Sequence, residues 1–312
     1  MASSTRRGQA WFVSMHTDQL TITAGMVRTI VDEQFPGWSQ LPIEDVASEG
    51  TTNAIFRIGD DLVARFPLRP DKPEVVRSLL ESEAAAAREL REHTSFPVPE
   101  PVAIGEPTTG YPLPWSVQTW LSGNTATADD PGASVEFGGD LAAFICEVRA
   151  IDTRGRVFDG HGRGGDLRAQ DDWMRMCLAR SHDVLPVDRL RALWDRLRQL
   201  PRHTPDVMTH GDLIPGNVLV SAGRLVGILD VGGLKPADPA LDLVGAWNLL
   251  DHERRARFRD DLGCGDLDWE RGKAWAFQQS IGLVWYYETS NPTMSFLGRR
   301  TLARIAADEG WS

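Results

Sequence analysis

The sequence predicts an α+β fold with a small β-rich N-terminal part and a larger, mostly helical C-terminal part. Apolar runs at 43–47, 54–58 and 62–66 are short and separated by turn residues, which is typical of antiparallel strands. Segments such as 134–150 and 269–287 are longer and carry apolar or aromatic residues at helical spacing. Strands that come first and helices that come later favour an α+β arrangement.

The remaining elements are predicted from capping residues, helix formers and chain breakers. Thr23 is suited to cap a helix whose apolar positions follow it, and Pro186 divides a helical region. We expect helices near 26–35, 74–93, 173–200 and 243–250, strands near 97–105 and 111–123, and a loop or lid at 152–172.

The most informative stretch is 209–230. Two short apolar runs, 218–220 and 225–229, flank a glycine-containing turn, and this pattern predicts a β-hairpin. Antiparallel neighbours bring Asn217 and Asp230 to the same end of the hairpin, within about 5 Å at the backbone. A loop that contains proline and glycine should bring Asp212 to that end as well.

Three polar side chains are therefore expected to converge. Asn217 and Asp230 offer hard oxygen ligands of the kind that Mg²⁺ takes beside waters and phosphate oxygens. Asp212 is free to accept a proton from an attacking hydroxyl. Protein kinases use a catalytic-loop Asp, an Asn and a metal-binding Asp in this order. The alternative is an ordinary hairpin whose Asp and Asn only cap turns.

The segment 210–217, H-G-D-L-I-P-G-N, resembles the H-G-D-x-x-x-x-N signature of the aminoglycoside phosphotransferase family. The segment 230–233, D-V-G-G, stands where that family has D-F-G or I-D-W/F, and 237–243 is similar to its G-D-P-x-x-D-L run. The resemblance implies a bilobal protein-kinase-like fold, with a small N-terminal antiparallel β-sheet lobe and a larger, mainly helical C-terminal lobe. It also implies phosphorylation of small molecules, often antibiotics.

The same resemblance assigns a cation and its partner in the N-terminal lobe. Arg65 occupies the position on the third strand where kinases have a Lys, and Arg is not a neutral replacement for it. Glu83 stands where the family has the paired helix Glu, with Glu81 as the nearby competitor. An exposed edge-strand Arg and a solvated Glu are the alternatives.

Two segments are expected to contact the nucleotide. A turn would lie over its phosphates, although a plain hairpin loop is the alternative because the turn has one glycine. This turn supplies Ser48, Gly50, Thr51, Thr52 and Asn53. The hinge strand would bind the purine edge through backbone groups of Gln118, Thr119, Trp120 and Leu121.

The lobes divide the chain into residues 1–120, the nucleotide-binding lobe, and 121–312, the catalytic and substrate-binding lobe. We interpret residues 1–17 as a loose leader, and Met15 is an alternative start to Met1. Asp242 is expected to support the catalytic loop or cap a helix, whereas Asp238 has a better chance of touching the site.

Composition narrows the class of partner. A formal net charge of −11 argues against a nucleic-acid binder and suits a cationic small molecule, although acidity can also serve solubility alone. The 3 cysteines lack C-x-x-C spacing, so reduced thiols and a cytoplasmic setting are expected. No apolar run approaches the roughly 20 residues of a membrane span. An acidic rim for a cationic acceptor would come from among Asp251, Glu253, Asp260, Asp261 and Glu288.

The expected reaction is transfer of the γ-phosphate of ATP or GTP to a hydroxyl of an antibiotic, such as an aminoglycoside, macrolide or peptide, with Mg²⁺ as cofactor. Asp212 orients the hydroxyl and takes its proton, while Asn217 and Asp230 hold the metal. One alternative is a metabolic kinase of the same fold for a sugar, choline or homoserine. A second is a non-catalytic pseudokinase, which Arg65 and the single-glycine turn would favour.

Overall fold

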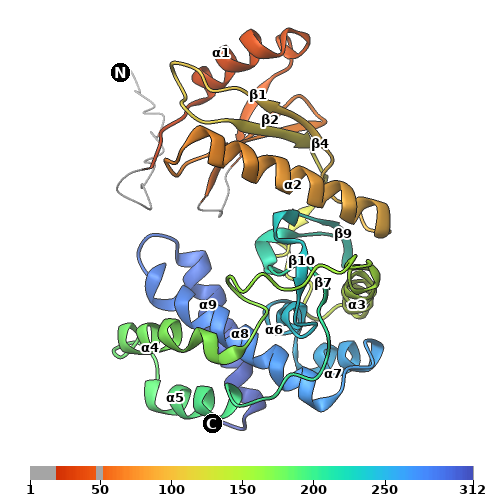
Figure 1. The fold of residues 1–312 in the computed structure, drawn as a ribbon, viewed down its shortest axis with the longest axis vertical. Coiled ribbons are helices and arrows are strands. Elements are labelled where there is room, and N and C mark those ends of the chain that lie inside the picture. Colours follow the sequence, from red (N-terminus) through yellow and green to blue (C-terminus); the bar gives the residue numbers. More distant parts are fainter. Residues whose placement is uncertain (1–18, 47–51, 312) are drawn as a thin grey trace, which may run out of the picture.

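The computed structural model describes residues 19–46 and 52–311. The expected leader at 1–17 and the phosphate-turn residues Ser48, Gly50 and Thr51 lie outside these ranges. The chain forms two lobes, one above the other along the long axis of the molecule (Figure 1). The upper lobe holds the main sheet and the lower lobe holds most of the helices, as the sequence predicts.

The N-terminal lobe is built on an antiparallel sheet that has five strands within the described residues, in the order β1-β2-β3-β5-β4. Adjacent strands β2 and β3 form the predicted hairpin around Gly59, whose φ of 61° suits glycine. The strands are β1 (Ile43–Val46), β2 (Asn53–Ile58), β3 (Leu62–Pro67), β4 (Pro101–Gly105) and β5 (Trp115–Thr119).

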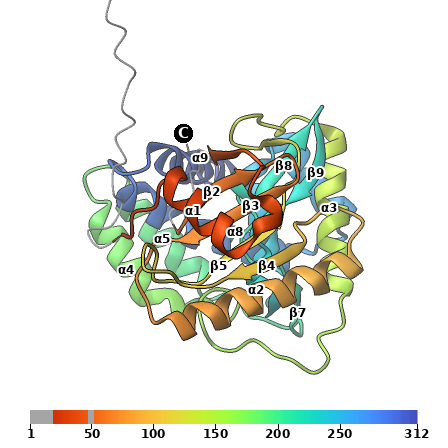
Figure 2. The same cartoon turned by 90° about the horizontal axis from the view of Figure 1, so that it is seen from above.

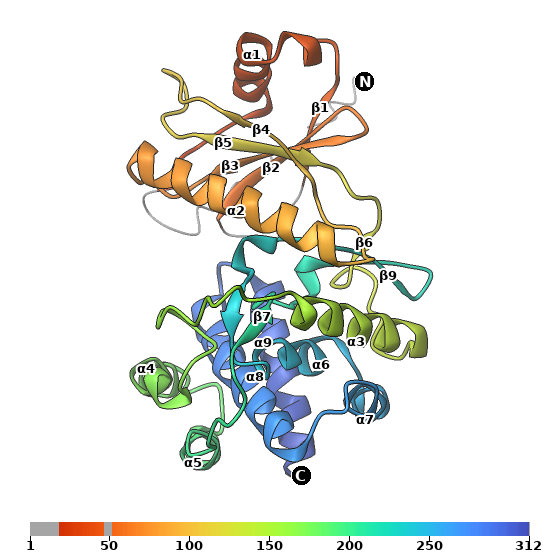
Figure 3. The same ribbon diagram turned by 45° about the vertical axis from the view of Figure 1, so that its right-hand side comes forward.

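Two helices accompany this sheet. Helix α1 (Ala24–Gln34) begins after Thr23, whose hydroxyl accepts a hydrogen bond from the Met26 amide. Helix α2 (Pro73–His93) runs along the lower side of the sheet and reaches toward the other lobe (Figure 3). A short 3₁₀ turn, η1 (Pro36–Trp38), follows α1.

Aromatic side chains fill the core of this lobe. The rings of Phe66 and Trp115 stack with centroids 4.6 Å apart, and Phe56 meets Phe66 edge to face. Gly105 makes room for this stack, because a Cβ there would lie 2.1 Å from the Trp115 ring. The core therefore fixes the β3–β5 pair, which carries the expected nucleotide-facing residues.

The chain passes between the lobes at residues 120–123. Gly123 has a φ of 146°, and a Cβ at this position would lie 2.9 Å from Val226, so the crossing needs glycine. Strand β6 (Asn124–Thr125) then pairs with β8 (Val218–Ser221), which pairs with β9 (Arg224–Ile228). The division of the chain at 120/121 stays a prediction.

The C-terminal lobe is mainly helical. Helix α8 is largely buried and packs against α4, α5, α6 and α9. Helices α3 and α4 lie on opposite sides of the lobe when the molecule is seen from above (Figure 2). The helices are α3 (Val135–Ala150), α4 (Asp171–Arg180), α5 (Val187–Leu197), α6 (Val244–Leu249), α7 (His252–Asp261), α8 (Asp266–Tyr286) and α9 (Pro292–Asp308).

Short elements complete the region between the lobes. Strands β7 (Val207–Thr209) and β10 (Lys235–Ala237) form an antiparallel pair. The 3₁₀ turns are η2 (Leu167–Gln170), η3 (Pro215–Asn217), η4 (Val231–Gly233) and η5 (Leu241–Leu243). Among the residues that the structure describes, no helix is both long enough and apolar enough to span a bilayer.

Candidate active site

The loop after β7 is held from below by one buried carboxylate. Asp242 is fully buried and accepts hydrogen bonds from the amides of His210 and Gly211, each at 2.8 Å. The fully buried His210 faces the carbonyl of Leu229 through Nε2, at 3.1 Å, while Nδ1 lies 3.3 Å from the Asp212 amide. Since an amide only donates, Nδ1 is the acceptor and Nε2 carries the proton. Asp242 thus supports the loop, as expected.

Asp212 projects from this loop with both carboxylate oxygens engaged. Oδ1 accepts hydrogen bonds from Gln279 Nε2 at 2.7 Å and from Arg163 Nη2 at 2.9 Å. Oδ2 accepts one from Asn217 Nδ2 at 3.1 Å. A carboxylate has about four lone-pair sites. One site on Oδ2 therefore remains for a hydroxyl, and the side chain is 32% exposed.

Gln279 on α8, which donates to Asp212, is oriented by a chain of buried hydrogen bonds. The hydroxyl of Thr301 donates to Asn248 Oδ1 at 2.9 Å, so the Asn248 amide group points toward Gln279 Oε1, 3.4 Å away. The other end of Gln279 then presents its NH₂ group to Asp212. Thr301 and Asn248 are buried, which fixes the orientation of Gln279 from α9 and α6.

The predicted hairpin brings Asn217 and Asp230 together. Strands β8 and β9 are antiparallel, and the Leu229 amide donates to the Asn217 carbonyl at 2.8 Å. Asp230, the next residue, has a left-handed backbone with φ 55° and ψ 55°. A non-glycine residue rarely adopts this conformation, and such residues cluster at functional sites. The Asp230 side chain is 51% exposed.

Arg65 links the two lobes at this point. It pairs with Glu83 on α2 and, through Nη2 at 3.3 Å, with Asp230 Oδ1. Burial acts to lower the pKa of Arg65, but the carboxylates of Glu83 and Asp230 outweigh it and raise the pKa above its ordinary value. Gly232 lets α2 approach closely, because a Cβ there would lie 3.1 Å from Glu83 Cγ.

Oxygen ligands for a divalent cation are present at the hairpin end. The Asn217 side chain donates through Nδ2 to Asp212, and within the described residues its Oδ1 has no hydrogen-bond partner. The exposed Asp230 carboxylate engages only Oδ1, again within the described residues. Carboxylate and carboxamide oxygens that keep open positions fit Mg²⁺, which retains several waters. No cluster of three or more His, Cys, Asp or Glu suited to a metal occurs in the described ranges.

The hinge segment has one backbone donor to spare. The Thr119 amide donates to the Glu100 carbonyl at 2.9 Å, and the Trp120 amide donates to the Asp61 carbonyl at 2.7 Å. Gln118 lies inside the sheet, paired with β3 and β4. Within the described residues the amide of Leu121 has no partner. Of the predicted hinge groups, Leu121 therefore offers the free N–H.

The phosphate turn is described only at its end. Asn53 starts β2 opposite Pro67, and the Thr52 carbonyl accepts a hydrogen bond from the Leu68 amide at 2.8 Å. These contacts anchor the turn to β3, and its other predicted residues lie outside the described ranges.

Comparison with known proteins agrees with this geometry. The sequence pattern of the phosphotransferase enzyme family (APH) matches residues 45–275, most of the chain. The chain belongs to this family. A 60-residue stretch is 40% identical to an aminoglycoside 3'-phosphotransferase of Escherichia coli and covers 19% of this chain and 22% of that protein. The chain thus matches about a fifth of the length of this curated relative.

Other relatives match over longer stretches. The uncharacterized protein YcbJ of Bacillus subtilis (strain 168) is 26% identical over 196 residues, 61% of this chain and 59% of that protein. The solved GDP complex of aminoglycoside 2'-phosphotransferase-IIIa matches with a TM-score of 0.68 at 19% identity, covering 92% of this chain and 100% of that one. The macrolide 2'-phosphotransferase MphH of Brachybacterium faecium matches with a TM-score of 0.57 at 20% identity, covering 90% and 97%. These two structures show a shared fold.

One expectation from the sequence is wrong for this family member. Asp238 does not reach the site, because it is fully buried and pairs with Arg271, which itself is 2% exposed. The expected acidic rim stays a prediction. Four of its five residues belong to α7 or its cap, which packs on α3 and α6, away from α4 (Figure 1). The fifth, Glu288, pairs with Arg299.

Sequence reasoning missed two residues that contact Asp212. Arg163 comes from the loop between α3 and η2, and Gln279 comes from α8. They stand 49 and 67 residues from Asp212 in the chain, so no local motif marks them. The Gly-, Arg- and Asp-rich composition of 152–172 predicted a loop or lid, and this was the available signal for Arg163.

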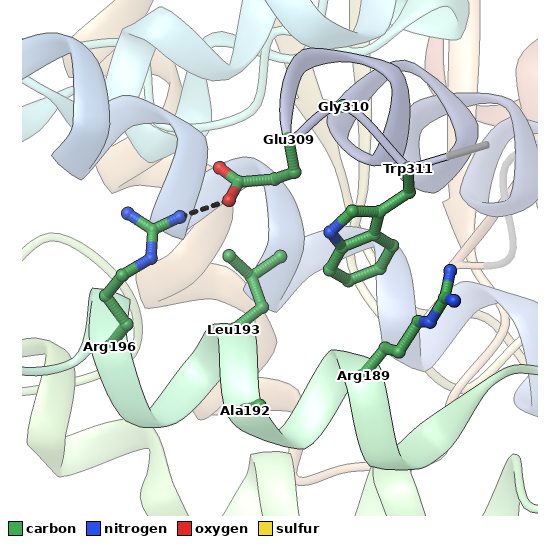
Figure 4. A pocket seen from close by; sticks show the side chains of 7 residues that line it. All are labelled: Arg189, Ala192, Leu193, Arg196, Glu309, Gly310 and Trp311. Atoms are coloured by element: carbon green, nitrogen blue, oxygen red, sulfur yellow. Dashed lines mark hydrogen bonds and ion pairs between the residues drawn. The ribbon is translucent and has the colours of Figure 1, made fainter.

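A separate hollow of about 490 Å³ lies between α5 and the end of α9 (Figure 4). Arg196 and Glu309 face each other there beside the indole of Trp311. It contains none of the predicted site residues. The candidate active site is therefore the interface between the lobes around Asp212.

Proposed function

We propose that this protein is a small-molecule kinase that transfers the terminal phosphoryl group of a nucleoside triphosphate to a hydroxyl. The observation that carries the proposal is the position of Asp212. Its carboxylate is hydrogen-bonded to Asn217, which shares a hairpin end with Asp230. Family membership and the bilobal fold support the same reaction class.

In the reaction, the acceptor hydroxyl donates its hydrogen bond to the remaining site on Asp212 Oδ2. Its oxygen attacks the γ-phosphorus, a bond from phosphorus to the acceptor oxygen forms, and the bond to the β,γ-bridging oxygen breaks. Asp212 takes the hydroxyl proton, and the nucleoside diphosphate leaves with the bridging oxygen. The Gln279 and Arg163 contacts hold the carboxylate still, and positioning of this kind supplies much of the rate in phosphoryl transfer.

Asn217 Oδ1 and Asp230 are the residues that would hold Mg²⁺. When bound there, the metal would supply positive charge that offsets the charge of the phosphates. The left-handed backbone of Asp230 presents its carboxylate next to Arg65. The Arg65 guanidinium, itself held by Glu83, is then available for the α- and β-phosphates.

The nucleotide is proposed to bind between the lobes. The free Leu121 amide would donate to the purine edge, and the turn that ends at Thr52 and Asn53 would cover the phosphates. Structures similar to this one are described as GDP and ATP complexes, which supports ATP or GTP as donor.

The acceptor is proposed from the relatives and from the site. The similar proteins are named aminoglycoside or macrolide phosphotransferases, which supports a hydroxyl-bearing antibiotic and a role in resistance. A metabolic kinase for an endogenous hydroxyl compound is the second candidate. The observation that favours it is Arg163, since a guanidinium beside Asp212 is a poor neighbour for a polycationic drug.

Asp212→Asn tests the proposal. This variant keeps the shape of the side chain but loses its basicity, so we expect turnover to fall by about 10²- to 10⁴-fold. Magnesium-dependent nucleotide consumption is measured with an acceptor panel that includes kanamycin, a macrolide, choline and homoserine. Arg175→Gln, in an exposed pair on α4, is the matched control and should behave like the wild type.

Equal rates in wild type and Asp212→Asn would refute the role of Asp212. If the wild type bound nucleotide but showed no magnesium-dependent nucleotide hydrolysis, the pseudokinase hypothesis would be supported instead. Expression in a susceptible host separates the two acceptor classes, because only an antibiotic kinase raises resistance.

A further inference from the structure

Arg163 is held at Asp212 by a loop that is itself anchored on both sides. The carbonyls of His161, Gly162 and Gly164 accept hydrogen bonds at 2.8–3.0 Å. The donors are the Lys235 ammonium group, the Gln170 side chain and the Asp238 amide. Arg163 therefore projects from a fixed backbone.

The close approach of this loop to β10 depends on a glycine. Gly164 has a φ of 106°, and a Cβ there would lie 2.6 Å from the Cβ of Ala237. Any other residue would strain the backbone and push the loop away from β10. The position of Arg163 is thus built into the fold.

The guanidinium uses one of its nitrogens and leaves the rest open. Nη2 donates to Asp212 Oδ1 at 2.9 Å and to the Gly211 carbonyl at 3.1 Å. Within the described residues, Nη1 and Nε have no hydrogen-bond partner, and the side chain is 26% exposed. Both parallel-donor edges of a guanidinium include Nη2, which is engaged here, so an anionic oxygen can bind the unpartnered Nη1 through a single charge-assisted hydrogen bond.

The two oxygens of Asp212 separate the two halves of the site. Oδ2 faces Asn217, the proposed metal ligand, and therefore the nucleotide. Oδ1 faces Arg163 and Gln279, which come from the helical lobe. Arg163 thus lies on the acceptor side of the carboxylate.

Two carboxylates in this region already have a cationic partner. Asp212 is neutralised by Arg163, and Asp159 on the same loop pairs with Lys235 at 3.5 Å. Neither carboxylate is left to attract an ammonium group. An acceptor with a positive charge beside its reacting hydroxyl would instead meet the guanidinium of Arg163.

We propose that Arg163 and Gln279 form an acceptor subsite that selects a hydroxyl compound with an anionic group, a carboxylate or a phosphate, close to the reacting hydroxyl. This inference rests on the proposed kinase function and narrows its substrate class. The hydroxyl binds Asp212 Oδ2 while the anionic group binds Nη1 of Arg163. Compounds with an ammonium group at the same place are rejected.

The test compares probes that differ only in charge. On a glucose frame these are glucuronate, glucose 6-phosphate, glucose and 6-amino-6-deoxyglucose, and on a glycerol frame they are glycerate, glycerol and 3-amino-1,2-propanediol. The readouts are kcat/KM for phosphorylation and competitive inhibition of nucleotide hydrolysis. We expect anionic probes to exceed neutral ones, and neutral ones to exceed cationic ones, by about 10- to 100-fold per step in at least one frame. The glucuronate and glucose 6-phosphate arms tell a carboxylate from a phosphate preference.

Variants of Arg163 make the test specific. Arg163→Gln should flatten the charge order, Arg163→Glu should reverse it, and Arg163→Lys should keep it in weaker form. Arg175→Gln is again the control that should keep the full order. Arg163→Gln should lower kcat for every probe, because Asp212 loses a hydrogen bond that positions it, whereas the change in charge order should appear mainly in KM.

Two results would overturn the proposal. One is the absence of any charge order in both turnover and inhibition for both frames. The other is a charge order that Arg163→Gln leaves unchanged, which would show that the guanidinium does not contact the charged group of the acceptor. Neither result would contradict the proposed kinase function. That function is tested separately, by magnesium-dependent nucleotide consumption and its loss in Asp212→Asn.

Discussion

Two Arg–Asp ion pairs, one inside the C-terminal lobe and one at the interface between the lobes, differ in their burial. Arg271 and Asp238 in the C-terminal lobe are 2% and 0% exposed, with Nη2 2.5 Å from Oδ2. Arg65 and Asp230 at the lobe interface are 12% and 51% exposed, and their contact is longer, 3.3 Å. We call the fully buried Arg271–Asp238 pair the sealed pair and the partly exposed Arg65–Asp230 pair the open pair.

The surroundings explain the difference. Arg271 also donates to the carbonyls of Leu200 and Pro201, and the Asp238 carboxylate also accepts from the Trp275 indole. Every direction is occupied by protein, so the pair joins α8 to the loops around it. Arg65, by contrast, is held by carboxylates on one side and faces an accessible site. A saturated buried pair stabilises structure, whereas a partly open pair can exchange partners with a ligand.

The largest effect is expected from breaking the sealed pair. Asp238→Ala leaves Arg271 buried without its counter-charge and removes the acceptor of Trp275. The free energy of unfolding should fall by about 3–5 kcal/mol, measured by urea denaturation. The double variant Asp238→Leu with Arg271→Met should lose less, because it removes both charges.

An exposed pair provides the control for this experiment. Asp172 and Arg175 are 91% and 74% exposed, so Asp172→Ala should change the free energy of unfolding by at most about 1 kcal/mol. If Asp238→Ala lowered the free energy of unfolding no more than Asp172→Ala does, the buried pair would stabilise the fold no more than an exposed pair.

The open pair should affect ligand binding more than stability. Arg65→Ala is expected to weaken nucleotide binding by about 10- to 100-fold, the value of one or two charge-assisted hydrogen bonds. Arg65→Lys keeps the charge but cannot contact Glu83 and the phosphates as a planar fork. Its nucleotide affinity should therefore lie between those of the wild type and Arg65→Ala. Binding is measured by calorimetry with magnesium, and unfolding is measured in parallel.

The comparison between Arg65 and Arg271 breaks down under one outcome. If Arg65→Ala destabilises the chain as much as Asp238→Ala while nucleotide affinity is unchanged, then Arg65 is a structural link between the lobes. The pairing with Glu83 and Asp230 would then serve lobe orientation alone.

The sequence predicted the parts of this site that depend on neighbouring residues. The β8–β9 hairpin follows from two apolar runs and a turn, so the shared end of Asn217 and Asp230 was predictable from pairing geometry. The helix register of α2 set Glu83 rather than Glu81 against Arg65. Resemblance to a known family added the bilobal fold, which propensity alone does not give.

The parts that were missed depend on packing between distant segments. Asp238 and Asp242 look equivalent in the sequence, yet the buried Arg271 from α8 captures the first and the catalytic loop captures the second. Arg163 and Gln279 reach Asp212 only because the loop and α8 fold over the same point. The choice among the five candidate rim residues stayed open because the sequence does not show which side of the lobe a helix occupies.

A third charged cluster, around Lys273, is less buried than the sealed pair. Breaking it is expected to have the smallest effect on the free energy of unfolding. Lys273 is 4% exposed and pairs with Glu270, Asp308 and Glu309. Burial raises the pKa of Glu309, but hydrogen bonds from Lys273 and Arg196 outweigh it and hold the pKa below its usual value. Glu309→Gln should cost about 1 kcal/mol or less at neutral pH, since Glu270 and Asp308 still face the ammonium group.

The pH dependence of this variant follows from the direction of the shift. A carboxyl group with a lowered pKa in the folded state stabilises the protein above the pKa it has when unfolded, about 4.3, and this contribution is lost as the pH falls through the folded-state value. The unfolding free energies of wild type and Glu309→Gln, measured by urea denaturation, should therefore differ at pH 7 and converge as the pH falls below the folded-state pKa. A gap that stayed constant across this range would mean that Glu309 contributes through packing beside Trp311 rather than through its charge. Convergence would show that the Glu309 charge carries its contribution, as the counter-charge does in the Arg271–Asp238 pair, but to a smaller extent because the site is less buried.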